Sequence, residues 1–307
     1  CPASVPISGS VSYDASSRAA IFTPALDLPL NTRCVATVAT GAQDSSGNAL
    51  PAPFSWAFVT GSGRDVTPPT VDQQTPAQNA SAPANTQVVA TFNEDMRPSS
   101  LNSTSFTLNT SVTNTPIVGS VSYAVGARTA TFTPTSPAPL PANTAFTATI
   151  GTAATDLAGN ALLIPKVWTF TTANVLDTTA PTVNLVSPVN DSAGVCLNTT
   201  VKATFSEPMA TMSLSTNTLT LAPSSSLGKT VSAVVTYDAL TQIAVIHPSA
   251  NLTANTVYTV TVKGGTWGVK DLANNAMQAD KVWRFSTGTG DCQSTVELGA
   301  ASNFAIL

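Results

Sequence analysis

The stretch Phe146-Thr147-Ala148-Thr149-Ile150 alternates apolar and polar side chains, and the same alternation returns at Tyr258-Thr259-Val260-Thr261-Val262. A period of two places successive side chains on opposite faces of the backbone, which predicts β-strands and argues against helices. Threonine is β-branched and suits the outer face of a pleated strand without adding charge. We therefore expect half-buried strands whose polar face is built from hydroxyl groups.

The chain also repeats itself at a long period. Gly9-Ser10-Val11-Ser12-Tyr13 returns as Gly119-Ser120-Val121-Ser122-Tyr123 and, in looser form, as Ala233-Val234-Val235-Thr236-Tyr237. An Asp-x-x-Gly-Asn loop, with Asn in place of Gly in the third copy, and a tryptophan follow in each copy. The sequence therefore predicts three units, each of roughly 110 residues when complete.

The front half of the unit occurs only twice. The segment 65–71 matches 177–183, and Phe92-Asn93-Glu94-Asp95-Met96 matches Phe205-Ser206-Glu207-Pro208-Met209. The first unit therefore lacks its opening strands. We expect a partial domain at residues 1–64, complete domains at 65–176 and 177–292, and a strand-like tail at 293–307 that starts a further domain or donates a strand.

About seven short strands per complete unit, separated by turn signals, describe an antiparallel β-sandwich of the immunoglobulin type. Prolines near Asp65 and Asp177 stiffen the connections, and the polar, Thr-rich faces leave little to drive packing side by side. The expected fold class is all-β, with tandem immunoglobulin-like antiparallel β-sandwiches in an extended row and almost no helix. A first unit without its opening strands should expose core side chains and unpaired sheet edges.

Charged side chains are scarce. The 307 residues include 12 Lys+Arg, 16 Asp+Glu and one His, so that 9% are charged, against about 25% in an ordinary soluble protein. With a net charge of −4 and no basic cluster, we expect neither a nucleic-acid partner nor membrane insertion of this segment. His247 stands where the other units carry threonine, which favours a surface role, and we do not expect an enzyme.

The four cysteines fit neither zinc-ligand spacing nor a redox pair. An even number suits two disulfides and an oxidising, extracytoplasmic setting, whereas four buried free thiols are the alternative. Cys34 takes an inward strand position and Cys1 lies a short loop upstream of the first strand pair, so Cys1–Cys34 is the local pairing. In the third unit, Cys196 lies just before the second strand and Cys292 just after the last one. Both should lie at the same pole of the sandwich, so Cys196–Cys292 is the second pairing.

Asp44, Asp156 and Asp271 open the repeated Asp-x-x-Gly-Asn loops and are candidate calcium ligands, because Asp and Asn oxygens on a tight turn can coordinate a hard cation. A simpler explanation is a turn in which Gly or Asn adopts a positive φ and Asp caps backbone amides. Each loop offers one carboxylate, whereas a tight calcium site gathers several. We therefore expect no metal and no other cofactor.

Five further residues recur at equivalent positions. Glu94 and Glu207 follow apolar strands; since neither has a paired acid or base at matching spacing, we expect each to make a structural hydrogen bond to a neighbouring loop rather than to act in catalysis. Trp56, Trp168 and Trp283 lie on the last strand of each unit, where alternation points them inward as core anchors. We predict no catalytic residues.

The second and third units resemble the bacterial Ig-like domain of the S-layer-protein type. The resemblance rests on Phe205-Ser206-Glu207-Pro208-Met209, Trp283-Arg284-Phe285-Ser286-Thr287 and Trp168-Thr169-Phe170-Thr171-Thr172, and it extends over nearly all of residues 1–288. It implies a secreted or surface-attached bacterial protein whose tandem modules act as a stalk, spacer or adhesive fibre. The family has no catalytic residues to transfer.

The last dozen residues differ in character from the repeats. The stretch from Val296 to Leu307 resembles the opening strand of a bacterial ice-binding β-solenoid domain, which implies that this chain extends such a domain. Alternatively, Val296, Leu298, Phe304 and Ile306 could form a donor strand that completes the first unit of another molecule, giving head-to-tail filaments.

We therefore expect an extracellular extender, stalk or fibre subunit, secreted or at the cell surface, that presents an ice-binding or adhesive domain. The alternative function is an adhesin-type module that recognises a surface glycan or protein.

Overall fold

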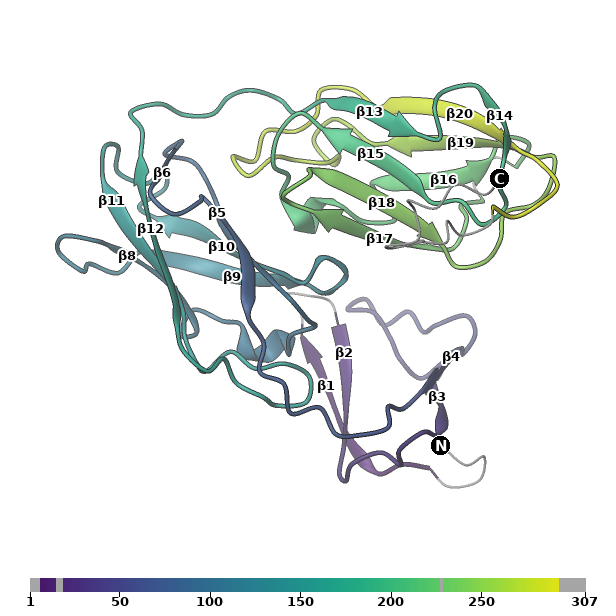
Figure 1. Ribbon diagram of the computed structural model, residues 1–307, viewed down its shortest axis with the longest axis horizontal. Helices are drawn as coiled ribbons and strands as arrows, with labels where there is room; N and C mark the ends of the chain where they lie inside the picture. The colour runs from purple at the N-terminus through teal and green to yellow at the C-terminus, as the bar shows by residue number, and fades with distance from the viewer. Residues whose placement is uncertain (1–5, 15–18, 227–228, 293–307) are drawn as a thin grey trace, which may run out of the picture.

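The computed structural model describes residues 6–14, 19–226 and 229–292 (Figure 1). Strands joined by loops and turns form this part of the chain, and its helical content is limited to the short 3-10 turns η1 (Pro98–Ser100), η2 (Val125–Ala127) and η3 (Thr211–Ser213). The predicted all-β tandem fold is thereby confirmed. We refer to residues 1–64, 65–176 and 177–292 as modules 1, 2 and 3.

Module 2 consists of two four-stranded sheets, ordered β5-β7-β10-β9 and β6-β12-β11-β8. All pairings are antiparallel except that between β6 and β12, which is parallel. The strands are β5 (Val71–Thr75), β6 (Ala80–Ala82), β7 (Val88–Phe92), β8 (Phe106–Thr110), β9 (Val118–Ala124), β10 (Thr129–Ser136), β11 (Ala145–Ile150) and β12 (Lys166–Thr172).

Module 3 repeats this topology, with sheets ordered β13-β15-β18-β17 and β14-β20-β19-β16 and a parallel pairing between β14 and β20. The strands are β13 (Val183–Ser187), β14 (Ser192–Val195), β15 (Val201–Phe205), β16 (Leu219–Pro223), β17 (Ala233–Asp238), β18 (Ile243–Pro248), β19 (Val257–Val262) and β20 (Lys281–Thr287).

The alternation read from the sequence sets the core of both sandwiches. Phe146, Ala148 and Ile150 of β11 are fully buried, whereas the threonines between them are only partly buried. Phe146 stacks on Phe170 of the neighbouring strand β12, with ring centroids 5.6 Å apart. On the outer face, the Thr147 hydroxyl lies 2.8 Å from that of Ser111. The threonine face therefore satisfies its polar groups by cross-strand hydrogen bonds, without charged side chains.

Module 1 has only two strand pairs in its described residues, drawn at the bottom of Figure 1. They are β1 (Gly9–Asp14) with β2 (Ala19–Pro24), and β3 (Arg33–Val38) with β4 (Phe54–Val59). Every residue of β4 is exposed, including Trp56. The prediction that Trp56 is a core anchor is therefore wrong for module 1, because no strand among the described residues covers it. The expectation that this unit exposes core side chains is confirmed.

Modules 2 and 3 are in contact, although the sequence suggested little packing between them. The η2 turn lies against β17 of module 3, and Ala127 packs at the edge of the module 3 core. Val125, Gly126 and Ala127 of module 2 also line one side of a cavity of about 320 Å³, whose opposite wall includes Thr211 and Val235 of module 3. The η2 turn of module 2 therefore packs against the surface of module 3.

Candidate functional site

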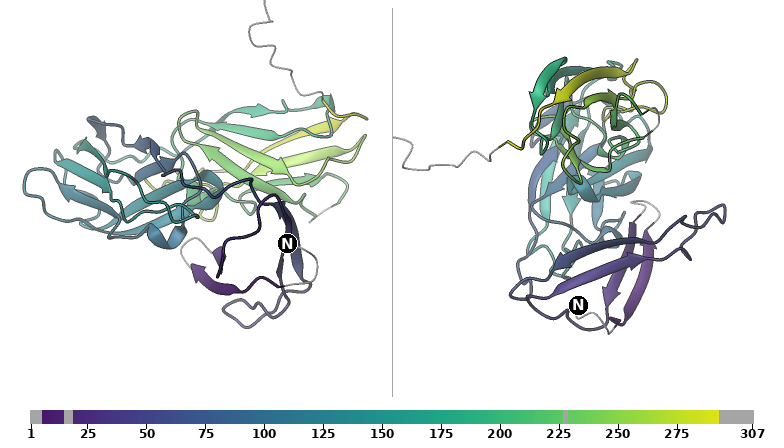
Figure 2. Two further views of the ribbon diagram at one scale, coloured as in Figure 1. Left: turned by 60° about the horizontal axis from the view of Figure 1, so that its bottom comes forward. Right: turned by 90° about the vertical axis from the view of Figure 1, so that its right-hand side faces the viewer.

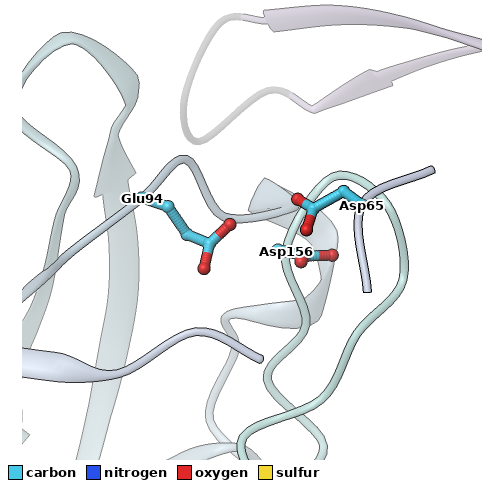
Figure 3. A group of neighbouring side chains, drawn as sticks. All are labelled: Asp65, Glu94 and Asp156. Atoms are coloured by element: carbon cyan, nitrogen blue, oxygen red, sulfur yellow. The ribbon is translucent and has the colours of Figure 1, made fainter. Parts of the chain in front are cut away.

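Three carboxylates converge where module 1 joins module 2. Asp65 lies in the segment before β5, Glu94 in the loop after β7, and Asp156 in the loop after β11. Figure 3 shows Glu94 reaching toward the two aspartates from the opposite side. One oxygen from each carboxylate lies within 4.8 Å of the others. The fold therefore gathers acids that are far apart in the sequence into one cluster.

The Asp-x-x-Gly-Asn loop fixes the buried member of this cluster. The backbone N–H and the side-chain amide of Asn160 both donate to the Asp156 carboxylate at 2.8 Å, and Gly159 adopts a φ of 94°. Asp44 accepts the same two bonds from Asn48 in module 1. The turn explanation for this motif is therefore confirmed, since the loop organises its own aspartate.

The same arrangement recurs between modules 2 and 3, where Asp177, Glu207 and Asp271 lie within 4.8 Å of one another. The pKa of Glu207 is raised to about 7, first by burial and then by the neighbouring Asp271 and Asp177 carboxylates. Burial likewise raises the pKa of Asp271. In the first cluster, the pKa of Glu94 is raised, mainly by burial and secondly by the negative charges of Asp156 and Asp65. Both clusters thus hold like charges close together at a cost in free energy.

Such oxygen clusters suit hard cations chemically. Calcium takes six to eight oxygen ligands in flexible geometry, and each cluster supplies three carboxylates at a module junction. Within the part of the chain that the structure describes, the one ion pair joins Arg128 to Asp95, 3.1 Å apart, rather than any of the six clustered acids. Each cluster of three carboxylates could hold one divalent cation. The cation would then relieve the repulsion between the carboxylates, as protonation of one of them otherwise does.

The sequence analysis placed only part of this site. Asp156 and Asp271 were singled out and do belong to the clusters, whereas Asp44 belongs to no such group among the described residues. The expectation that Glu94 and Glu207 have no acidic neighbour is wrong, because the sandwich brings the loops after β7 and β11 together. One pattern in the sequence could have predicted the clusters. An acid in the linker, an acid in the Phe-x-Glu motif and an acid in the turn all recur at equivalent positions in modules 2 and 3.

The second junction is also tied together by hydrogen bonds. Asn85 of module 2 donates its side-chain amide to the Asp177 carbonyl at 2.8 Å and accepts the Asp177 N–H at 2.9 Å. Asn275 of module 3 donates to the same carbonyl at 3.1 Å. In addition, the Gln87 N–H donates to the Leu272 carbonyl across the junction at 3.1 Å. The linker residue Asp177 is therefore held from both modules at once.

The remaining predicted residues are structural in different ways. Trp168 and Trp283 are almost fully buried in the cores of their modules. His247 is exposed, and its Nε2 lies 2.9 Å from the Thr236 hydroxyl on the neighbouring strand. None of these three side chains lies in the acidic clusters.

Cys196 and Cys292 form a disulfide, with their Cα atoms 5.2 Å apart. The bond joins the end of module 3 to the residue after β14, as the topology predicted. Cys34 is buried, and its expected partner Cys1 lies outside the described residues. So do the predicted donor-strand residues Val296, Leu298, Phe304 and Ile306.

The chain is a tandem β-sandwich protein built from repeated modules. It has two sandwiches of identical topology, preceded by a partial third module, and acids and linker contacts lie at each junction. Comparison with protein families matches the bacterial Ig-like domain at residues 2–60, 65–172 and 177–287. The chain therefore belongs to the bacterial Ig-like domain family.

The solved structures that match the chain share little sequence with it. The N-terminal part of the bacterial S-layer protein SbsC is 16% identical, with a TM-score of 0.30, over 72% of this chain and 44% of that one. SbsC domains 1–6 are 16% identical, with a TM-score of 0.32, over 72% and 26%. The titin fragment A168169 is 10% identical, with a TM-score of 0.24, over 73% and 100%. The chain thus spans less than half of the S-layer chains it matches.

No curated protein matches the sequence. In the described ranges, no helix has both the length and the apolar character needed to cross a membrane.

Proposed function

We propose that the chain is an extracellular structural extender, a stalk or fibre subunit in which successive Ig-like modules hold a fixed spacing. The observation that carries this proposal is the linker residue Asp177, which is bound by Asn85 of one module and Asn275 of the next. A connection fastened on both sides limits the swing that a free linker would allow. A fixed spacing is what a spacer requires.

Three further features support a secreted or cell-surface setting. The Cys196–Cys292 disulfide suits an oxidising compartment. The outer strand faces are rich in hydroxyl groups and poor in charge, so they are hydrated without forming a charged recognition surface. The family assignment supports a role built from repetition. This role is structural and non-catalytic.

Stretching single molecules of the full chain from both ends tests the extender role. At low force, we expect the end-to-end length of the chain to stay constant. At higher force, we expect it to increase in discrete steps as single modules unfold. Because the disulfide closes a loop of 96 residues in module 3, on the order of 300 Å of chain should stay hidden until a reductant is added. Gradual extension at low force, without discrete steps, would contradict a spacer under tension.

What the stalk presents is predicted from the sequence alone. The presentation of an ice-binding or adhesive domain is proposed only from the resemblance of the sequence at 296–307 to the start of an ice-binding solenoid. Head-to-tail self-association is the alternative, proposed from the apolar pattern of the same residues. Both remain predictions on residues outside the described ranges.

A second candidate function, adhesion to a surface glycan, is favoured by Trp267. This side chain is 88% exposed, on a loop at 263–270 that is longer than the corresponding module 2 loop at 151–155. The loop is tightly built: a Cβ on Gly264 would lie 2.4 Å from the Ala279 backbone, and one on Gly268 would lie 2.3 Å from the Lys263 carbonyl. An aromatic ring held outward in charge-poor surroundings offers a stacking surface for a sugar ring.

A glycan array probed with the full chain tests this candidate. Specific binding should be lost in Trp267→Ala and retained in Leu240→Ala, which removes another highly exposed apolar side chain of module 3. Equal binding by both variants, or no binding by the unaltered chain, would argue against adhesion through this loop.

A further inference from the structure

The chain leaves module 3 through the same kind of hydrogen bonds that hold it where it leaves module 2. Asn85 donates its side-chain amide to the Asp177 carbonyl at 2.8 Å and accepts the Asp177 N–H at 2.9 Å. In module 3, Asn198 donates to the Cys292 carbonyl at 3.0 Å and accepts the Cys292 N–H at 2.9 Å. Figure 2 (left) shows the yellow end of module 3 at the pole that faces away from module 2. Each of these two pairs is called a linker clamp below.

Equivalent backbone contacts lie beside both linker clamps. The Ala84 N–H donates to the Val175 carbonyl at 3.1 Å, and the Leu197 N–H donates to the Gly290 carbonyl at 3.0 Å. An asparagine side chain has both a donor and an acceptor, so it can pair with the N–H and the carbonyl of one residue as a neighbouring strand would. The linker clamp therefore binds the backbone of the outgoing chain, which is why it accommodates an aspartate in one module and a cysteine in the other.

The two linker clamps differ in what fastens the outgoing chain a second time. At Asp177 the following module does so, because Asn275 of module 3 donates to the same carbonyl at 3.1 Å. At Cys292 the second fastening is the disulfide to Cys196, which lies within module 3 itself. The position of Cys196 is occupied in module 2 by Pro83, which cannot form a cross-link. The disulfide thus stands where module 2 relies on a contact from its neighbour.

The residue before Cys292 is held as well. The side-chain amide of Asn251 lies 2.8 Å and 3.0 Å from the two carboxylate oxygens of Asp291. Each of the residues 290–292 therefore has a contact of its own to the body of module 3. The last residues of a domain are poorly ordered unless they are tied down, and β20 already ends at Thr287. The contacts at 290–292 thus hold a stretch of chain that lies beyond the last strand of the sandwich.

We propose that the second linker clamp fixes the direction in which the chain leaves module 3, with the Cys196–Cys292 disulfide acting in place of a following module. The proposal rests on the extender function and carries it from the spacing of modules to the orientation of the segment that follows them. Because the two clamps bind equivalent residues, the chain leaves each module along the same path relative to its own sandwich. The disulfide makes that path at module 3 independent of any neighbour.

Two matched distances within the full chain test the proposal. Spin labels on non-canonical amino acids are placed at Val282 and Gln293 of module 3 in one sample, and at the equivalent Val167 and Thr178 of module 2 in another. The two pairs have the same sequence separation, and each spans its own linker clamp. Pulsed electron resonance should give one narrow distance distribution for each pair, with the same mean distance in both.

Removing the second linker clamp should broaden the module 3 distribution. In a variant that combines Cys196→Ala, Cys292→Ala and Asn198→Asp, residues 289–293 are released, and the distance should spread over on the order of 10 Å. Asn198→Asp alone removes the amide donor, keeps the disulfide and should give a smaller broadening. The matched control is Asn217→Asp, which alters an exposed asparagine of the same module and should change nothing. The native tryptophan emission of module 3 shows that each variant is folded.

Three outcomes would overturn the proposal. The first is a broad module 3 distribution in the unaltered chain, and the second is a mean distance that differs from that of the module 2 pair. The third is a folded triple variant whose distribution is as narrow as that of the unaltered chain. A failure of the extender function gives a different result, because it would broaden the distance between modules 2 and 3 while the distance within module 3 stays narrow.

Discussion

At the residue scale, two tyrosines show how the modules fasten their front halves to their back halves. The hydroxyl of Tyr237, on β17, accepts the backbone N–H of Met209 at 2.9 Å, and Tyr123 makes the same bond with Met96 in module 2. These tyrosines are almost fully buried, whereas Tyr13 of module 1 is exposed. Each bond satisfies a buried donor in the segment that follows an apolar strand.

Removing one of these hydroxyls should destabilise its module. Tyr237→Phe leaves the buried Met209 N–H without its partner, so the free energy of unfolding of module 3 should fall by about 1–3 kcal/mol. Urea denaturation followed by fluorescence measures this change. Tyr13→Phe is the matched control, because that side chain is exposed, and it should have almost no effect; equal losses in both variants would contradict the assignment.

Glu207 predicts a pH dependence of module 3. Its pKa in the fold is about 7, above the ordinary value of 4.5. The native state therefore holds its proton more tightly than the unfolded state, and the stabilisation is complete below about pH 4.5 and lost as the pH rises through about 7. Glu207→Gln should flatten this dependence and stabilise module 3 at pH 8 by about 1 kcal/mol after allowance for solvent screening.

Thermal unfolding at pH 5 and pH 8, in the presence of a chelator, measures this effect. Asp72→Asn removes one exposed negative charge elsewhere and should leave the pH profile unchanged. A Glu207→Gln profile that still falls between pH 5 and pH 8 would show that other groups carry the dependence. Titrating calcium in the same assay without the chelator compares a cation with a proton as the neutralising charge of the cluster formed by Asp177, Glu207 and Asp271.

At the element scale, strands were more predictable than loops. The alternation at 146–150 and 258–262 predicted both the strands and the buried face, because a period of two fixes which side chains share a face. The same rule failed for Trp56, since burial also depends on covering strands, and the described part of module 1 has only two strands in each sheet. Glu94 was also misjudged, because its neighbours come from loops about 30 and 60 residues away that only the sandwich topology joins.

The disulfide gives a prediction for one element. Cys196–Cys292 connects the residue after β14 to the chain that follows β20 and closes a loop of 96 residues. Replacing both cysteines with alanine should lower the free energy of unfolding of module 3 by about 2–4 kcal/mol. Differential scanning calorimetry of the full chain should show the module 3 transition moving down while the module 2 transition serves as an internal control. Unchanged transitions would show that the bond adds no stability.

At the scale of the whole molecule, the repeats predicted a tandem of Ig-like modules, but not how neighbouring modules meet. Asp177 is a linker aspartate in the sequence, and its two asparagine partners lie about 90 residues upstream and about 100 residues downstream. The packing of η2 against β17 likewise depends on the angle between sandwiches, which no local pattern encodes. The junction is therefore the part of the account that most needs a direct measurement.

The distribution of distances between modules 2 and 3 tests the central claim of a fixed spacing. Spin labels on non-canonical amino acids at Val167 and Val282, exposed and equivalent positions on β12 and β20, report it by pulsed electron resonance. We predict one narrow distribution for the intact junction, broadening when Asn85→Ala and Asn275→Ala are combined, and no change in Asn48→Ala, the equivalent asparagine of module 1. A distribution that is already broad in the unaltered chain, and is unchanged by the double variant, would contradict the account.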